Sequence, residues 1–405
     1  MFPQRITAAP PDAILGLTEE FKKDPHPYKV NLGVGVFVDE TGRTPVLKTV
    51  RRAEKKILRE ETSKSYLPIA GSPDFRRLVR GLMLGEGSGA PEEARVALLH
   101  APGGTGALRL GAEVLRAFVP SARIWLSAPT WPNHRGLLKA AGFALKEYPY
   151  YDPATRGLAF EALHTALAEA GEDDVVVLHA CCHNPSGVDL SPAQWQELAD
   201  LAVRQRWIPF FDFAYQGFAE GLDADRAGLL PFLKTDRPVF VAGSFSKNFG
   251  LYNERTGALA FVGPTAEETA AMMTHLQATA RVLYSNPPAH GGAIVAAILG
   301  EPAARREWEG EVTAMRERIH AVRHALADGL ERRGAGDFSF IRTQQGMFSF
   351  SGLNDAQVRY LREMKSIYIV GGGRINVAGI IPSALDRVCD AIAEALKIPA
   401  AGGHG

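Results

Sequence analysis

Short apolar runs, each separated from the next by a helical or turn segment, constrain the fold of this chain more than any other feature. They are rich in β-branched and aromatic residues and cover residues 96–100, 124–127, 143–148, 175–181, 208–213, 238–242 and 257–262. Two of them, 238–242 and 257–262, are apolar throughout, and the others are mostly apolar, which is typical of strands buried on both faces of a sheet. Their alternation with amphipathic helices predicts an α/β domain with a mostly parallel sheet covered by helices.

The pattern changes near residue 310, which predicts a second domain. The elements expected there are a long helix at 311–333, strands at 347–350, 367–370 and 375–377, and a closing helix at 382–397. Near the other end of the chain, residues 30–38 form an apolar run interrupted by Gly33 and Gly35 and are predicted as a strand. We predict a large domain at 45–310, a smaller α+β domain built from both chain ends at 15–44 and 311–398, and an N-terminal arm at 1–14.

The charge balance argues against a protein that attracts polyanions through its net charge. The 405 residues include 45 basic and 45 acidic side chains, so no nucleic-acid partner is expected and any anion site must be local. No apolar run approaches the roughly 18 residues of a membrane span, and the N-terminus lacks the apolar centre of a signal peptide. We therefore expect a cytoplasmic protein without a membrane partner.

The three cysteines are too few for a disulfide framework. Cys181 and Cys182 lie in an apolar run, where they are expected to behave as small buried hydrophobic side chains. His179 and His183 flank the pair, but alternation along a strand and the Asn-Pro that follows argue against a zinc site. No metal is expected.

Lys247 lies where a sheet of this kind would place a reactive lysine. It follows the run 238–242 in the segment Ser244-Phe245-Ser246-Lys247, and Arg255 comes eight residues later. Open α/β sheets bind ligands at the carboxyl ends of their strands. A lysine can form an imine with an aldehyde, and hydroxyls with a guanidinium suit a phosphate, a combination that matches pyridoxal 5'-phosphate (PLP). An isolated Ser-x-x-Lys is more often a solvated loop lysine, so the other strand ends must decide.

Other predicted strand ends carry side chains that suit the same cofactor. Residues 103–106 are predicted as a glycine-rich turn before a helix, which could hold a phosphate on its backbone N–H groups or could be only a tight turn. Asp212 could pair with a protonated ring nitrogen, or could simply cap a helix. Asn184 and Tyr215 suit the phenolic oxygen of the ring. Trp131 could stack on the ring, although a single tryptophan is more often part of the core.

These stretches together resemble the class I (fold type I) PLP-dependent aminotransferases, closest to the bacterial aspartate and aromatic amino-acid aminotransferases. The matching segments run in family order over almost the whole chain and comprise residues 31–35, 103–108, 131–134, 181–187, 212–218, 244–255, 284–288, 346–350 and 373–374. The resemblance implies PLP as the cofactor, amino acids and 2-oxo acids as substrates, and a homodimer with shared active sites.

The resemblance also implies roles for the residues around the cofactor. Lys247 would be the Schiff-base lysine and would move the substrate proton. Asp212 would pair with the ring nitrogen, with His134 behind it, and Tyr215 would join Asn184 on the phenolic oxygen. Trp131 would lie on the ring face. The phosphate would be held by Gly104, Thr105, Ser244 and Arg255 of the same chain, and Tyr66 would reach it from the second subunit.

For the substrate, the resemblance implies two carboxylate-binding arginines. Arg374 would clamp the α-carboxylate, and Arg281 of the second subunit would meet a side-chain carboxylate. The other substrate contacts would come from Gly35, Trp131 and Asn184. Three positions depart from the family pattern, namely Thr256, Phe37 and Gly372; Phe37, near the substrate entrance, could favour apolar side chains.

The presence of both arginines implies transfer of the amino group from L-aspartate to 2-oxoglutarate. Relatives that accept aromatic substrates keep the same arginine as Arg281, so an aromatic or broad-specificity aminotransferase stays open. PLP domains of this fold also serve as non-catalytic ligand sensors in transcription regulators. Such regulators carry a basic DNA-binding segment ahead of the PLP domain. The residues that precede the predicted PLP domain in this sequence are not a basic segment of that kind.

Overall fold

The computed structural model describes residues 13–87 and 89–399, and these divide into two compact units. The central unit comprises Thr44–Ile319 and Thr343–Gly346, and the terminal unit comprises the residues up to Arg43, His320–Arg342 and those from Met347 on. The predicted N-terminal arm at 1–14 lies outside the described residues apart from its last two, which belong to α1 (Ala13–Lys23).

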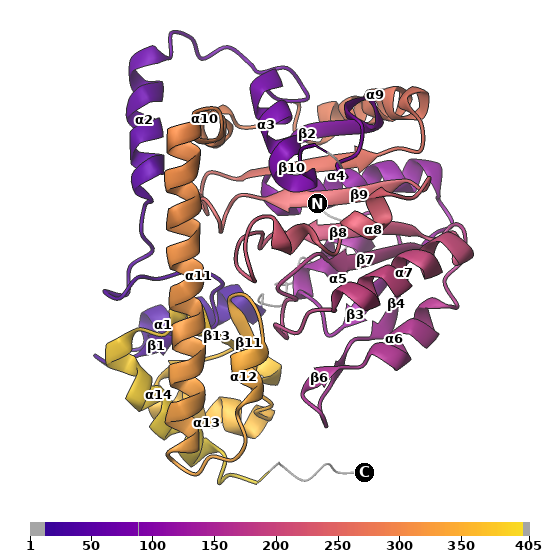
Figure 1. Ribbon diagram of the computed structural model, residues 1–405. Helices are drawn as coiled ribbons and strands as arrows, with labels where there is room; N and C mark the ends of the chain where they lie inside the picture. Colours follow the sequence, from indigo (N-terminus) through magenta and orange to yellow (C-terminus); the bar gives the residue numbers. More distant parts are fainter. Residues whose placement is uncertain (1–12, 88, 400–405) are drawn as a thin grey trace, which may run out of the picture. The chain divides into compact units, whose positions relative to one another are not determined.

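The central unit is built on a seven-stranded sheet with the order β2-β10-β9-β8-β7-β3-β4 (Figure 1). All neighbouring pairs are parallel except those of β10 with β2 and with β9. The strands are β2 (Val96–Pro102), β3 (Arg123–Ala128), β4 (Ala144–Pro149), β7 (Val175–His179), β8 (Ile208–Phe213), β9 (Val239–Ser244) and β10 (Thr256–Val262). This is the α/β class with a mostly parallel sheet that the sequence predicts.

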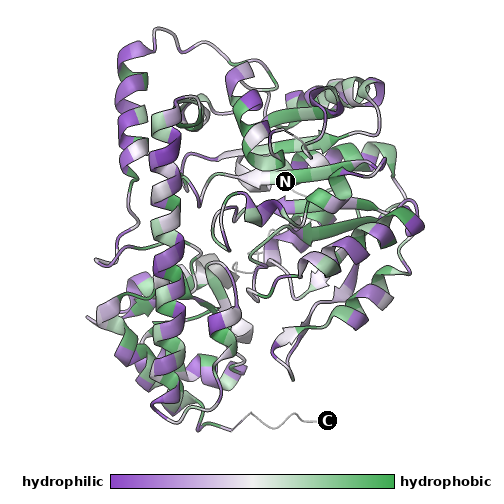
Figure 2. Cartoon of the chain, in the orientation of Figure 1, coloured by the Kyte–Doolittle hydropathy of each residue, from purple (hydrophilic) through white to green (hydrophobic). Residues whose placement is uncertain are grey.

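Helices cover both faces of this sheet, which explains the continuous apolar strands. Phe210 and Phe211 are consecutive on β8 and point to opposite faces, and both are fully buried. Phe210 packs beneath α4, where a Cβ on Gly111 would lie 2.5 Å from its ring. Phe211 meets Phe232 of α8 with ring centroids 5.1 Å apart. Figure 2 shows the resulting apolar sheet beneath helices with polar outer faces.

The remaining elements of the central unit are mainly helical connections. The helices are α2 (Lys48–Glu60), α3 (Pro73–Leu84), α4 (Gly103–Phe118), α5 (Pro132–Ala140), α6 (Phe160–Leu167), α7 (Pro192–Gln205), α8 (Leu230–Leu233), α9 (Ala266–Leu283) and α10 (Ala289–Leu299). A short hairpin joins β5 (Tyr151–Asp152) and β6 (Gly157–Leu158). Ser72 and Ser191 cap α3 and α7, since each side chain accepts a backbone N–H three residues on, and each is followed by a proline in the first helical turn.

The terminal unit is α+β and has two small sheets. One pairs β1 (Val30–Asn31) with β12 (Ile367–Tyr368) in parallel, and the other pairs β11 (Phe348–Phe350) with β13 (Arg374–Asn376) antiparallel. Its helices are α1, α12 (Phe340–Thr343), α13 (Asp355–Lys365) and α14 (Pro382–Ala395), together with the last part of α11 (Pro302–Glu331).

Three predicted elements differ from the structure by more than one or two residues at their ends. The strand predicted at 30–38 ends at Asn31, because the carbonyls of Gly33, Val34 and Val36 accept side-chain N–H groups instead of strand partners. The turn predicted at 103–106 is the first turn of α4. The long helix begins at Pro302, nine residues before the predicted start, since proline suits the first helical turn.

No helix in the described part of the chain combines the length and the apolar character that crossing a membrane requires.

Candidate active site

Lys247 lies in the segment that follows β9, at the carboxyl end of the central sheet. Its Nζ is 4.9 Å from the centroid of the Tyr215 ring. Burial lowers the pKa of the amine to about 8; Arg255 adds to this effect, while the negative charge of Asp212 opposes it. At pH 7 about a tenth of the amine is then unprotonated, a far larger share than the ordinary pKa of 10.5 would give, and the unprotonated form is the one that a proton acceptor or nucleophile requires.

Asp212 lies near the end of β8, the strand between β7 and β9, and its side chain is 12 % exposed. His134 Nε2 is 3.0 Å from Asp212 Oδ2, and Thr130 Oγ1 is 2.9 Å from His134 Nδ1. Burial alone would raise the pKa of Asp212, but the hydrogen bond and charge of His134, together with the charge of Lys247, outweigh it and lower that pKa. The carboxylate is thus ionised, and His134 Nε2 must carry the proton that it donates.

Asn184 is buried and contacts two other buried residues, Tyr215 and His179. Asn184 Nδ2 donates to Tyr215 Oη at 3.4 Å, and the backbone N–H of Asn184 donates to His179 Nδ1 at 3.0 Å. The ring of His179 is therefore protonated on Nε2 when neutral. Burial lowers the pKa of His179 to about 3, His134 adds to the shift and Asp212 opposes it, so His179 stays neutral and keeps accepting that bond.

An anion cradle lies where β2 meets α4. Gly103 has a φ of +70°, and a Cβ there would be 2.6 Å from Arg255 Nη2; a Cβ on Gly104 would be 3.0 Å from Ser244 Cβ. Thr105 belongs to the same first turn of the 16-residue α4, whose N–H groups have no partners within the helix. Backbone N–H groups at the start of a helix, a serine hydroxyl and a guanidinium that meet at glycine positions suit a phosphate.

Trp131 stands at the N-cap of α5 and is partly buried. Its ring meets that of His134 edge-on, with centroids 5.3 Å apart, which places the indole next to the Asp212–His134 pair. The central unit therefore brings together Lys247, Asp212, Tyr215, Asn184, Trp131, Ser244, Arg255 and the start of α4, and this set fits a cofactor with a ring nitrogen, a phenolic oxygen and a phosphate.

Tyr66 and Arg281 are not part of this cluster within one chain. Tyr66 is 92 % exposed, and Arg281, exposed in the last turn of α9, donates to the hydroxyl of Ser285. Asn286 Nδ2 donates to Leu67 O at 2.6 Å. This bond joins the segment after Arg281 to the loop of Tyr66, so the two exposed side chains flank one hydrogen-bonded junction.

Arg374 and Gly35 belong to the terminal unit and share one aromatic ring. Arg374 is only 3 % exposed; its Nη2 donates to Gly33 O at 2.5 Å, and its Cζ lies 4.4 Å from the centroid of the Phe348 ring. A Cβ on Gly35 would lie 2.8 Å from Phe348 Cζ. The guanidinium thus packs on an aromatic face beside a segment that tolerates little added bulk.

Sequence reasoning missed two contributors to the central cluster. Thr130 orients His134, and Ser246 Oγ receives bonds from Ser244 Oγ at 3.2 Å and from Arg255 Nη1 at 3.4 Å. Ser246 lies in the Ser-x-x-Lys segment and could have been found from that motif, whereas Thr130 carries no local signal. His179 was considered only as a metal ligand, and its partner is a backbone N–H group, which no side-chain pattern reveals.

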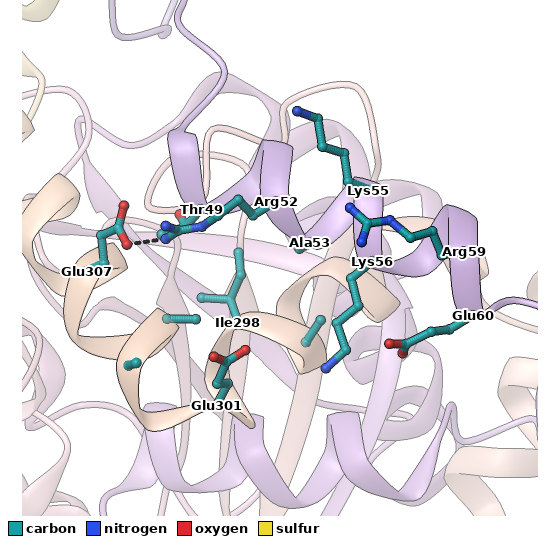
Figure 3. A pocket seen from close by; sticks show the side chains of 13 residues that line it. Thr49, Arg52, Ala53, Lys55, Lys56, Arg59, Glu60, Ile298, Glu301 and Glu307 are labelled. Atoms are coloured by element: carbon teal, nitrogen blue, oxygen red, sulfur yellow. Dashed lines mark hydrogen bonds and ion pairs between the residues drawn. The ribbon is translucent and has the colours of Figure 1, made fainter.

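A separate groove of about 490 Å³ lies between α2 and the α10–α11 corner (Figure 3). Arg52 forms an ion pair with Glu307 across it, and Glu311 accepts the backbone N–H groups of Lys48 at 2.6 Å and Thr49 at 3.3 Å. None of the predicted site residues lines this groove. These contacts hold the start of α2 against α11.

A sheet that carries a buried lysine with a lowered pKa, a paired carboxylate and a candidate anion cradle at its strand ends has the groups that a lysine-based α/β active site requires. Residues 27–392 match the family model described as aminotransferase class I and II. The chain is 49 % identical to an aspartate aminotransferase of Salmonella typhi over 394 residues, covering 97 % of this chain and 100 % of that relative. It is 42 % identical to an aromatic-amino-acid aminotransferase of Pseudomonas aeruginosa over 391 residues, covering 96 % and 98 %.

Solved structures agree with the sequence comparison. The aromatic-amino-acid aminotransferase from Burkholderia pseudomallei, covalently bound to pyridoxal phosphate, superposes with a TM-score of 0.93 at 46 % identity and covers 97 % of this chain and 98 % of its own. The chain belongs to the class I and II aminotransferase family.

Proposed function

We propose that this protein is a PLP-dependent aminotransferase that moves the amino group of L-aspartate to 2-oxoglutarate, giving oxaloacetate and L-glutamate in a ping-pong reaction. The observation that carries the proposal is the placement of the buried Lys247 amine at the end of the sheet, 4.9 Å from the centroid of the Tyr215 ring and near enough to Asp212 for the carboxylate charge to act on its pKa, which is lowered to about 8. The relatives named above support it, because the bacterial aspartate aminotransferase is the more similar of the two curated proteins.

The residues around Lys247 would each hold one part of the cofactor. The carboxylate of Asp212, kept ionised by His134, would pair with the ring nitrogen. Asn184 and Tyr215 would bind the phenolic oxygen, and Trp131 would cover the ring. The phosphate would lie in the cradle formed by Gly104, Thr105, Ser244 and Arg255, with Tyr66 of a second subunit.

When bound, PLP supplies an electron sink for the negative charge that develops at the substrate Cα. Lys247 would then accept the Cα proton and return it, which its lowered pKa permits near neutral pH. The amine must be free of its own proton to do this, and its burial favours that form.

Substrate selection would rest on two arginines. Arg374 would bind the α-carboxylate through its planar guanidinium, with Gly35 leaving room beside it. Arg281 of the second subunit would bind the side-chain carboxylate of aspartate. The exposure of Tyr66 and Arg281 at one junction supports a homodimer in which both reach a neighbouring site.

The test is to mix the PLP-loaded protein in turn with L-aspartate and L-phenylalanine, without any 2-oxo acid, and to follow the visible absorption of the cofactor in a stopped-flow instrument. The proposal predicts rapid bleaching with aspartate and much slower bleaching with phenylalanine. Comparable rates would indicate a broad aromatic–dicarboxylate enzyme instead. Absence of bleaching with both would overturn the aminotransferase assignment for these substrates.

A further inference from the structure

Arg323 is a fully buried arginine that the reaction described above does not use. It lies on the part of α11 that belongs to the terminal unit, and it is 0 % exposed. Removing a guanidinium from water is costly unless its N–H groups find acceptors inside the protein. Its contacts therefore show what it holds in place.

The guanidinium of Arg323 joins two elements that are separate along the chain. Nη1 donates to Ile341 O at 3.2 Å, on α12, and to Ser349 Oγ at 2.6 Å, on β11. Nη2 donates to Phe348 O at 2.6 Å, also on β11. Both terminal nitrogens of one planar group thus fix the first two residues of β11.

The same short strand carries the aromatic surface on which Arg374 lies. The carbonyl of Phe348 accepts from Arg323, while its ring packs against the Arg374 guanidinium with 4.4 Å between Cζ and the ring centroid. β11 also pairs with β13, in a register that places Phe350 opposite Arg374 and Phe348 opposite Asn376. Asn376 in turn donates to Val34 O at 2.6 Å and Val36 O at 2.8 Å. One strand therefore positions both the arginine and the glycine-containing segment beside it.

We propose that Arg323 is a positioning residue that sets the orientation of Arg374 through β11 and the Phe348 ring. The proposal rests on the role proposed above for Arg374 as the α-carboxylate clamp. A bidentate guanidinium–carboxylate pair depends on the plane of the guanidinium, and that plane is supported here by the Phe348 ring. A lysine at position 323 would keep the charge but would supply a single nitrogen in place of the two that now reach three acceptors.

The test is a double-mutant cycle with Arg323→Lys, Arg374→Ala and the combined variant, all measured as the PLP-loaded full chain. We expect Arg323→Lys to raise KM for aspartate by on the order of 10-fold, the range for one lost charged hydrogen bond, with a smaller change in kcat. Affinity for maleate, a dicarboxylate without an amino group, should fall by a similar factor in calorimetry. In the Arg374→Ala background, Arg323→Lys should change neither quantity further, because it acts through Arg374.

Arg306→Lys is the matched control, because this arginine is exposed on the same helix and should leave KM and maleate affinity unchanged. Ser349→Ala removes one acceptor of Arg323 and should reproduce part of the KM effect if Arg323→Lys fails to fold. Additive effects of Arg323→Lys and Arg374→Ala on maleate affinity would overturn the positioning role, since they would show a general structural defect. A normal KM for aspartate in Arg374→Ala would instead overturn the carboxylate clamp itself, and the inference with it.

Discussion

Burying the amine of Lys247 should destabilise the cofactor-free protein at neutral pH, and replacing this lysine by methionine should relieve that cost. The pKa of Lys247 is lowered to about 8 in the folded protein from an ordinary value of 10.5. Below pH 8 the lysine is charged in both the folded and the unfolded states, and the folded state bears the full cost of burying the charge. The difference of about 2.5 pKa units corresponds to about 3 kcal/mol in the free energy of unfolding.

The sign of the pH dependence follows from the same pKa values. Between about pH 8 and pH 10.5 the unfolded chain binds more protons at this lysine than the folded chain, so this residue's contribution to stability rises with pH. Above pH 10.5 both states are neutral there and the cost disappears. The advantage of Lys247→Met over the unmodified protein should therefore be largest below pH 8 and should vanish toward pH 10.5.

Urea unfolding of the cofactor-free proteins at pH 7 and pH 10 measures this effect. Lys247→Met should be more stable at pH 7 by up to about 3 kcal/mol, and the difference should shrink strongly at pH 10. Lys55→Met is the control, because Lys55 is exposed on α2 and should show no pH-dependent gain. A Lys247→Met protein that is no more stable than the unmodified protein at pH 7 would refute the reasoning.

Two further predictions concern the surroundings of the site. The pKa of His179 is about 3 in the folded protein against an ordinary 6.5, so the unmodified protein should lose stability as the pH falls from 6.5 toward 3, by up to about 4–5 kcal/mol. A urea midpoint that stays constant over this range in both His179→Asn and the unmodified protein would contradict this prediction. Gly103→Ala should weaken PLP binding by at least about 10-fold, because the added Cβ would lie 2.6 Å from Arg255 Nη2 at a residue with a φ of +70°. Gly136→Ala is the control, because the Cβ added there would lie no closer than 3.7 Å to another atom. It should leave the PLP affinity measured by fluorescence titration unchanged.

The fold class could be predicted because the strands of the central sheet carry their own signal. β7, β8 and β9 are buried on both faces, so each begins with an unbroken apolar run, at 175–178, 208–211 and 239–242. The start of α11 gave no such signal, because its first residues are mostly charged or small and Trp308 is its main buried anchor there. The strand predicted from residue 30 stopped at Asn31, since side chains of the distant Arg374 and Asn376 satisfy the carbonyls that follow.

The same difference applies to the candidate site: residues with a local sequence signal could be predicted, and residues whose role depends on a distant contact could not. Lys247, Asp212 and the glycines at the start of α4 could be named because each lies at or shortly after the carboxyl end of a predicted strand. Thr130 could not be named, because its importance depends on a contact with His134 that only the folded chain shows. Arg323 was equally hidden, since its acceptors lie 18 to 26 residues away along the chain.

Transfer of a labelled amino group tests the proposed function most directly. The PLP-loaded protein would be incubated with ¹⁵N-labelled L-aspartate and unlabelled 2-oxoglutarate, and the products would be analysed by mass spectrometry. The account predicts ¹⁵N-labelled glutamate and unlabelled oxaloacetate in equal amounts, and no labelled glutamate with Lys247→Met. Release of the label as ammonia, or labelled glutamate formed as fast by Lys247→Met, would contradict an aminotransferase that works through Lys247.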